Sequence, residues 1–348
     1  MKKISVGILG ATGMVGQRFI TLLQNHPWFE ITVVAASPKS AGKKYKEAVE
    51  GRWVMKEPIP SRIASLNVDA VEDDLDKITK KVSFVFSALD LEKEKIREIE
   101  NNFASRGIPV VSNNSAHRWS KDVPVIIPEI NPGHLILIKQ QQKNRGWKQG
   151  FIVVKPNCSV QSYVPLLTPL LKFQPKKVIV TTLQAVSGAG KTLNTWPEMQ
   201  ENIIPYIAGE EEKSEKEPLK IWGNKKIKIS ATCIRVPLKD GHMASVNIRF
   251  TKKVTKEEIL RAWKNFNPLK NLSLPFSPTP FITVMEEEDR PQTRLDRMAG
   301  LGMGISVGRL RQIGPKSFSF IGLSHNTIRG AAGGAILTAE LLKRKGYL

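Results

Sequence analysis

The chain has 348 residues, and its 53 lysines and arginines against 32 aspartates and glutamates give a net charge of +21. This length favours two domains, and a composition that is 41% hydrophobic and 24% charged excludes a disordered chain. The apolar runs are too short to span a membrane, and the basic doublets scattered among them favour a solvated surface over a nucleic-acid-binding one.

The first part of the chain alternates between strand-like and helix-like runs. Residues 4–9 and 31–36 are rich in β-formers, and residues 14–23 between them carry apolar side chains at helical spacing. The alternation continues with strands at 82–86, 108–111 and 151–154 and a charged helix at about 91–104. Strands that alternate with helices predict a parallel sheet.

The pattern changes beyond residue 156. A helix is predicted over 255–266, with Thr255 as N-cap and Glu258 at the capping-box position, and another over 329–345. The polar stretch 210–220 is interpreted as an exposed loop or helix start. Long strand-like runs make up most of the remainder, at 178–186, 227–236, 244–251, 305–310 and 318–323. They predict a mixed or antiparallel sheet with one covered face.

A glycine-rich turn, Gly10-Ala11-Thr12-Gly13-Met14-Val15-Gly16, follows the first strand and opens the first helix. Glycines let a backbone approach a pyrophosphate, and a helix N-terminus offers free N–H donors. The strand–turn–helix context therefore predicts a dinucleotide site. Because the spacing is GxxGxxG instead of GxGxxG, a purely structural turn remains the alternative. The second strand ends in Ala35-Ala36-Ser37-Pro38-Lys39-Ser40, without the carboxylate that binds an NAD ribose. We therefore expect NADP.

One of the two cysteines lies in a position suited to catalysis. Cys158, in Pro156-Asn157-Cys158-Ser159, precedes an apolar segment predicted to be helical from about Val160, where a helix dipole would stabilise a thiolate. A nucleophile is favoured over a structural thiol. Cys233 lies inside a strand and is interpreted as a buried structural thiol. Two cysteines are too few to stabilise a chain of this size through disulfides, and the first apolar run is too short for a signal peptide. Both observations predict a reducing, cytoplasmic setting.

A thiol nucleophile needs a base. Arg235 ends one predicted strand and His242 begins the next, which suits a carboxylate-binding guanidinium beside a general base. No histidines or cysteines have metal-ligand spacing, so no metal is expected. The segment 185–192, AVSGAGKT, is close to a phosphate-binding P-loop, but Pro197 interrupts the helix that such a loop needs, so an ATPase is disfavoured.

Taken together, the chain resembles aspartate-semialdehyde dehydrogenases of the archaeal and fungal branch over nearly its whole length. The motifs that carry the resemblance are Gly10-Ala11-Thr12-Gly13, Pro156-Asn157-Cys158-Ser159, LQAVSGAG at 183–190, GEEEK at 209–213, Arg235 with His242, and SHNT at 324–327. The resemblance implies NADP-dependent interconversion of aspartate 4-semialdehyde plus phosphate with 4-aspartyl phosphate, in lysine, threonine, methionine and isoleucine biosynthesis.

The resemblance also implies roles for single residues. Cys158 would form an acyl-thioester, His242 would be the acid–base group, and Gln184 would orient the substrate. Arg235 would bind the substrate α-carboxylate and Glu210 its amino group. The implied phosphate binders are Arg118, Asn157 and Lys213. The implied cofactor-binding residues are Gly10, Thr12, Gly13, Met14, Val15, Ser37, Ser40, Ser187, Gly188, Ala189, Gly190 and Asn326.

The implied fold class is α/β. A Rossmann-type parallel-sheet domain would cover residues 1–155, with a C-terminal helix at 329–348 docking back onto it. An α+β catalytic and dimerisation domain with a mixed, largely antiparallel sheet would cover 156–328. The expected partners are a small-molecule substrate, phosphate and further copies in a homodimer or homotetramer, without nucleic acid or membrane. The alternatives are malonyl-CoA reductase on the same scaffold and a non-catalytic basic nucleotide-binding protein.

Overall fold

The computed structural model describes residues 2–224 and 226–348, which form two compact units. The first unit contains the described residues up to Pro128 together with Pro132–Pro156 and Ala331–Leu348. The second contains Glu129–Asn131 and the described residues of Asn157–Gly330. No helix in the described ranges is long and apolar enough to cross a bilayer.

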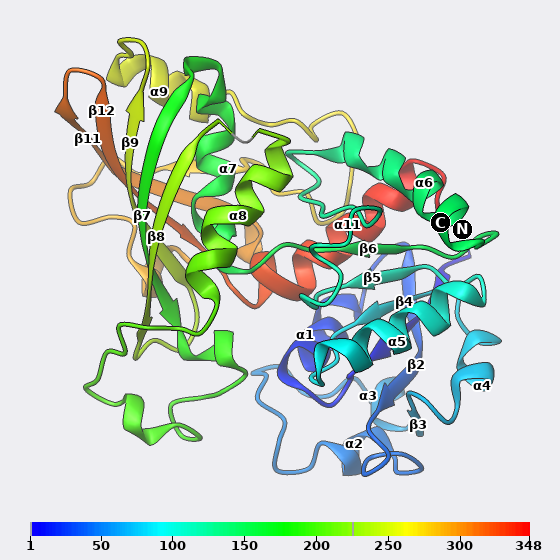
Figure 1. Ribbon diagram of the computed structural model, residues 1–348. Helices are drawn as coiled ribbons and strands as arrows, with labels where there is room; N and C mark the ends of the chain where they lie inside the picture. The colour runs from blue at the N-terminus through cyan, green and yellow to red at the C-terminus, as the bar shows by residue number, and fades with distance from the viewer. Residues whose placement is uncertain (1, 225) are drawn as a thin grey trace. The chain divides into compact units, whose positions relative to one another are not determined.

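The first unit is built on a six-stranded sheet in the order β3-β2-β1-β4-β5-β6, with every neighbouring pair parallel (Figure 1). The chain leaves the middle of the sheet in one direction from β1 to β2 and in the other from β4 to β5. Right-handed crossovers therefore place α1 and α5 on opposite faces. The strands are β1 (Ile4–Leu9), β2 (Phe29–Ala36), β3 (Val68–Ala70), β4 (Phe84–Ser87), β5 (Val110–Ser112) and β6 (Ile152–Val154). The helices are α1 (Met14–Leu23), α2 (Tyr45–Ala48), α3 (Ser61–Ala64), α4 (Leu75–Thr79), α5 (Lys93–Ser105), α6 (Leu137–Arg145) and α11 (Gly333–Arg344).

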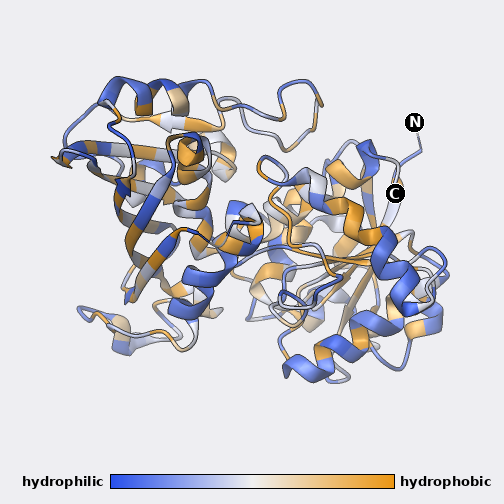
Figure 2. Cartoon of the chain, turned by 45° about the horizontal axis from the view of Figure 1, so that its top comes forward, coloured by the Kyte–Doolittle hydropathy of each residue, from blue (hydrophilic) through white to orange (hydrophobic). Residues whose placement is uncertain are grey.

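The core of this unit lies along the strands, where hydrophobic residues gather while the surrounding helices keep a hydrophilic side (Figure 2). All four residues of β4 are buried, and Phe86 stacks on Phe19 of α1 at 4.5 Å between ring centroids. Helix α11 is buried from Gly333 to Leu342. The C-terminal segment is therefore part of the core of the first unit.

The second unit contains a sheet in the order β10-β11-β12-β9-β7-β8. Its three central pairs are antiparallel, and the pair at each edge is parallel. These two sheets confirm the predicted fold class. The strands are β7 (Pro175–Ala185), β8 (Lys228–Val236), β9 (His242–Phe250), β10 (Ile282–Val284), β11 (Ile305–Gly314) and β12 (Ser317–Ser324). The helices are α7 (Val164–Leu167), α8 (Glu210–Trp222), α9 (Lys256–Lys264) and α10 (Thr293–Asp296).

The predicted elements differ from the structure in several places, and strands β3 and β10 and helix α6 were not predicted. The stretch 210–220 is predicted to be an exposed loop or a helix start; α8 does begin at Glu210, but its Glu210, Ser214 and Glu217 are buried instead of exposed. The C-terminal α-helix begins at Gly333 instead of 329 because the backbone is non-helical at Ala331. The apolar helix expected from about Val160 is broken into short 3₁₀ and α segments, as described below. Helix α9 has the predicted capping box.

Candidate active site

Cys158 lies at the start of a short 3₁₀ turn, Ser159–Ser162, and not of a long helix. The α-helix that follows, α7, has four residues, and a second 3₁₀ turn containing Pro169 succeeds it. Prolines at 165 and 169 break up the helical run that the apolar pattern predicts. So short a helical segment has a small dipole. The chemical environment of the thiol is therefore set by side chains around it.

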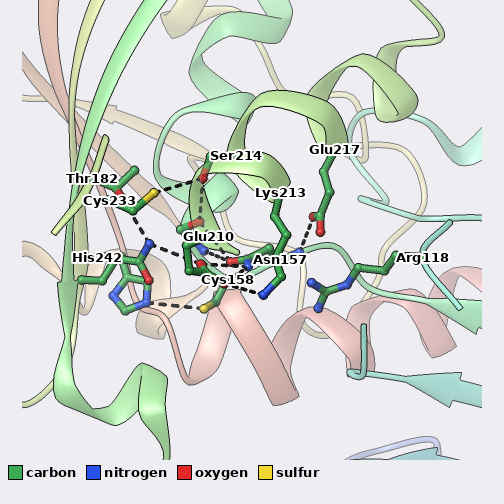
Figure 3. A network of polar contacts seen from close by, with 12 residues as sticks. Arg118, Asn157, Cys158, Thr182, Glu210, Lys213, Ser214, Glu217, Cys233 and His242 are labelled. Carbon is green, nitrogen blue, oxygen red and sulfur yellow. Dashed lines mark hydrogen bonds and ion pairs between the residues drawn. The ribbon is translucent and has the colours of Figure 1, made fainter. Parts of the chain in front are cut away.

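His242, the first residue of β9, faces the thiol with Nε2 at 3.4 Å from Sγ of Cys158 (Figure 3). On its other side, Nδ1 accepts the backbone N–H of Ala185 at 3.1 Å. A neutral imidazole carries one proton, so that proton lies on Nε2 and points at the sulfur. Burial, and then the Arg235 guanidinium, lower the pKa of His242 to about 3. The ring is neutral at physiological pH.

Arg235 and Gln184 are register partners on the neighbouring strands β8 and β7. The Arg235 guanidinium is buried and donates from Nη1 to the carbonyl of Ala185 at 2.7 Å. Gly188 leaves the space beside it open, because a Cβ there would lie 3.0 Å from Arg235 Nη1 and 3.0 Å from His242 Nε2. The arginine and the histidine therefore both lie against Gly188, and the histidine contacts the thiol, so a cation suited to an anionic substrate lies close to the thiol–imidazole pair.

Glu210, at the start of α8, adds an acid to this group. Its carboxylate accepts two bonds from Asn157 Nδ2, at 2.8 and 2.9 Å, and pairs with Lys213 Nζ at 2.8 Å. Gln184 Nε2 donates to the same carboxylate at 3.3 Å. The structure thus brings together the predicted Cys158, His242, Gln184, Arg235, Glu210, Asn157 and Lys213 within the second unit.

The P-loop-like segment 185–192 also lies in the second unit, and no α-helix follows it directly. Residues Val186–Ala189 form a 3₁₀ turn, and the Lys191 ammonium lies over the Trp196 ring at 4.7 Å. Asn326 Nδ2 donates to Ser187 Oγ at 2.8 Å, and its Oδ1 accepts from Gly241 N at 2.8 Å. The predicted cofactor residues Ser187, Gly188, Ala189, Gly190 and Asn326 therefore lie close to His242.

The glycine-rich turn of the first unit borders a cavity of about 210 Å³. Gly10 has φ +79°, and a Cβ there would lie 2.3 Å from the carbonyl oxygen of Ala88. A Cβ on Gly16 would lie 2.3 Å from the Gly10 carbonyl oxygen, so both positions require glycine. Of the predicted cofactor residues, Gly10, Thr12, Gly13 and Ser37 line this cavity, whereas Met14, Val15 and Ser40 do not.

Two acids that the sequence analysis did not consider for this site, Glu72 and Asp90, also line the cavity. Glu72 is paired with Lys95, so its charge is partly balanced. Arg118, a predicted phosphate binder, is a buried residue of the first unit. Its Nε donates to the carbonyl of Lys155 at 3.0 Å and its Nη2 to that of Asn113 at 3.1 Å. The guanidinium is therefore fixed in orientation.

Sequence reasoning missed three residues. Glu217 and Ser214 of α8 contact Asn157 and Ser159 in the segment Asn157–Ser159, called here the cysteine segment, and the hydroxyl of Tyr163 donates to the carbonyl of Ser214. A helix signal was present, since three glutamates begin the stretch and Gly223 ends it. Cys233 is fully buried, and its Sγ shares a hydrogen bond of 3.5 Å with Ser214 Oγ. Both features suit a structural thiol. Among the described residues, no group of histidines, cysteines and acids could hold a metal ion.

Comparisons with known proteins agree with this picture. Residues 5–138 match the semialdehyde dehydrogenase NAD-binding domain, and residues 167–329 match the semialdehyde dehydrogenase dimerisation domain. An aspartate-semialdehyde dehydrogenase of Archaeoglobus fulgidus is 47% identical, over 98% of each chain. The crystal structure of the Candida albicans aspartate-semialdehyde dehydrogenase with NADP has a TM-score of 0.88 at 38% identity and covers 100% of both chains.

A malonyl-CoA reductase (NADP) of Metallosphaera sedula is 36% identical, over 100% of this chain and 99% of its own. The parallel-sheet unit with its glycine-rich turn and the two matched domain families define a semialdehyde dehydrogenase. More particularly, the chain belongs to the aspartate-semialdehyde dehydrogenase family, which confirms the resemblance found in the sequence.

Proposed function

We propose that the chain catalyses the NADP-dependent interconversion of aspartate 4-semialdehyde plus phosphate with 4-aspartyl phosphate, in the biosynthesis of amino acids of the aspartate group. The observation that carries this proposal is the 3.4 Å contact between Cys158 Sγ and His242 Nε2, beside a buried arginine and a buried glutamate. In the biosynthetic direction the reaction is a reduction.

The substrate is an amino acid, and the site has a partner for each of its charges. Arg235 binds the α-carboxylate, because a planar guanidinium can bond both oxygens. Glu210 binds the ammonium group, and Gln184, in register with Arg235, orients the substrate toward the thiol. Asn157 and Lys213, both hydrogen-bonded to Glu210, are phosphate binders in this proposal, and Arg118 of the first unit is a third.

In the oxidative direction, the Cys158 thiolate attacks the aldehyde carbon, and a C–S bond forms as the carbonyl π electrons move to oxygen. The Nε2–H of His242 donates a hydrogen bond first to the sulfur and then to the new alkoxide, so it stabilises the negative charge on each in turn. NADP, when bound, supplies the hydride chemistry that relates this thiohemiacetal to the thioester. Phosphate then attacks the thioester carbon, and Cys158 leaves as a thiolate.

The residues present fit NADP. Gly10 and Gly16 keep the turn free of side chains, and the segment after β2 has the hydroxyl of Ser37 and no carboxylate. The nucleotide-binding residues at the start of α1 are Thr12 and Gly13, followed in the chain by Met14 and Val15. After β2, Ser40 follows Ser37 and completes the set. Ser187, Gly188, Ala189, Gly190 and Asn326 would flank the nicotinamide.

The domain assignment follows from these roles. Residues 1–155 with the C-terminal helix form the NADP-binding domain, and residues 156–328 form the catalytic and dimerisation domain. The protein works in the cytoplasm as a homodimer or homotetramer, without nucleic acid or membrane partners. Light scattering coupled to gel filtration tests the assembly, and a mass equal to one chain of 38.8 kDa would contradict it.

A spectrophotometric assay tests the reaction. Purified protein is supplied with aspartate semialdehyde, phosphate and NADP⁺, and the reduced nicotinamide is followed by absorbance. We expect absorbance growth that requires phosphate and is much slower with NAD⁺. Activity confined to malonyl-CoA and NADPH would instead identify a malonyl-CoA reductase. A protein that shows no hydride transfer but binds nucleic acid in a salt-dependent way would be the non-catalytic alternative.

A further inference from the structure

Helix α8 presents one buried face to the cysteine segment. Glu210, Ser214 and Glu217 recur at intervals of four and three residues, so their side chains leave the helix on the same side. Ser214 Oγ lies 3.5 Å from Ser159 Oγ, and Glu217 Oε2 accepts the backbone N–H of Asn157 at 2.6 Å. Figure 3 shows Glu217 directed at Asn157, the residue before the nucleophile.

Asn157 is held at its backbone N–H and at both polar atoms of its side chain. Its Nδ2 donates to Glu210, and its Oδ1 accepts from Ser159 N at 2.8 Å and Ser159 Oγ at 3.0 Å. Its backbone N–H is the group that Glu217 binds. Asn157 is 5% exposed and Glu217 is 1% exposed, so water cannot replace a lost carboxylate without rearrangement.

From these contacts we propose that Glu217 is a positioning residue that fixes the Asn157–Cys158 backbone and so holds the thiol in line with His242. The proposal rests on the proposed function only in naming Cys158 as the nucleophile. A nucleophile displaced by about 1 Å can lose on the order of a hundredfold in rate, so an anchor on the adjacent peptide has a large effect on chemistry.

The same helix offers a matched control. Glu215 Oε1 accepts the backbone N–H of Ala231 at 3.1 Å, on the edge strand β8. Glu215 and Glu217 are therefore both helix glutamates that bind a backbone N–H, but only Glu217 binds the cysteine segment. Comparing Glu217→Asp with Glu215→Asp separates positioning of the thiol from general support of the fold.

Aspartate keeps the negative charge and is one methylene shorter, so Glu217→Asp loses the bond to Asn157 N–H without changing the local charge. We expect kcat with aspartate semialdehyde to fall about tenfold or more, with a much smaller change in KM. Alkylation of Cys158 by iodoacetamide, followed on its own peptide by mass spectrometry, should shift to higher pH because the Nε2–H bond that stabilises the thiolate is lengthened.

Glu217→Gln keeps the length and one acceptor oxygen, and should restore kcat to within about threefold of the unaltered protein. Glu215→Asp should leave both kcat and the pH profile of alkylation unchanged. The proposal is overturned if Glu217→Asp matches the unaltered protein in both readouts, or if Glu215→Asp alters them equally. Because iodoacetamide needs no substrate, the alkylation result stands even if aspartate semialdehyde is not turned over.

Discussion

At the scale of single residues, the site depends on how closely the groups around Cys158 approach one another. Gly330 lies against the nucleophile, and a Cβ there would meet Cys158 Cβ at 2.8 Å and its Cα at 3.3 Å. Neither atom belongs to the far end of a flexible side chain. The position beside the thiol therefore has room for glycine alone, for a reason of space and not of backbone angle.

We expect Gly330→Ala to displace Cys158 from His242 and to lower kcat by about ten- to a hundredfold. The measurement is steady-state turnover together with the rate of Cys158 alkylation. Gly133→Ala is the control, since a Cβ at Gly133 meets nothing within 4 Å. Equal activity of the two variants would contradict the close packing at the nucleophile.

The neutrality of His242 gives a pH dependence of stability. Its pKa is about 3 in the folded protein and 6.5 when unperturbed, so between these values the unfolded chain binds the additional proton. The neutral imidazole's contribution to the free energy of unfolding is therefore fully present above pH 6.5. Below pH 6.5 it decreases by up to about 1.4 kcal/mol for each unit by which the pH is lowered.

We therefore expect the free energy of unfolding of His242→Asn to fall less steeply between pH 6.5 and pH 4 than that of the unaltered protein. Denaturant titrations at several pH values measure this difference. Parallel pH profiles for the two proteins would show that the imidazole is not buried in its neutral form.

At the scale of elements, α8 contains an inner proline whose consequence is visible in the structure. Pro218 has no N–H, so the carbonyl of Ser214, four residues earlier, lacks its helical donor. The hydroxyl of Tyr163 takes that place, with a bond of 2.6 Å to the Ser214 carbonyl. The gap in the helix is thus filled by Tyr163, which follows the cysteine segment in the chain.

We expect Tyr163→Phe to destabilise the protein by about 1–3 kcal/mol, because a buried carbonyl loses its donor. In a Pro218→Ala background the same change should cost clearly less, since the restored N–H of residue 218 can serve the Ser214 carbonyl. Denaturant unfolding of the four proteins gives the coupling energy. Additive effects would argue against this account of the helix.

Helix α8 also shows where sequence patterns stop being informative. Long strand-like runs predicted β7, β8, β9, β11 and β12, and in β9 buried residues alternate with more exposed ones, as in a strand with one covered face. The charged residues of α8 predict a solvated surface by composition alone. Glu210 and Glu217 are buried because they bind Asn157, more than fifty residues away, and no local pattern encodes that contact.

At the scale of the whole molecule, the chain crosses between two units, and its last helix returns to the first. His26 follows α1, and its Nδ1 accepts the N–H groups of Trp28 at 3.1 Å and Phe29 at 3.0 Å. The ring proton therefore lies on Nε2, which donates to Glu340 of α11 at 2.8 Å. This buried bond joins the two ends of the first unit.

We expect Glu340→Ala to lower the stability of the protein by about 1–3 kcal/mol, because the buried Nε2–H loses its acceptor. Glu340→Gln keeps an oxygen acceptor and should cost clearly less. Thermal unfolding compares the two variants. If they are equally stable, the contact with His26 does not hold α11 in place.

The net charge of +21 remains largely separate from the chemistry, since the proposed site uses only a few cations, such as Arg118, Lys213 and Arg235. Short motifs and the family resemblance predicted residues that the structure brings together, such as Cys158, His242 and Glu210. The contacts that orient the nucleophile, from Glu217 and Gly330, come from distant parts of the chain and needed the structure.

The central claim is that Cys158 forms an acyl-thioester with an aspartate-derived substrate. The most direct measurement is mass spectrometry of the protein after incubation with aspartate semialdehyde and NADP⁺ without phosphate. We expect an aspartyl group on the peptide that contains Cys158, its loss on addition of phosphate, and no adduct in Cys158→Ser. Phosphate-dependent turnover by Cys158→Ser at the rate of the unaltered protein would contradict the claim.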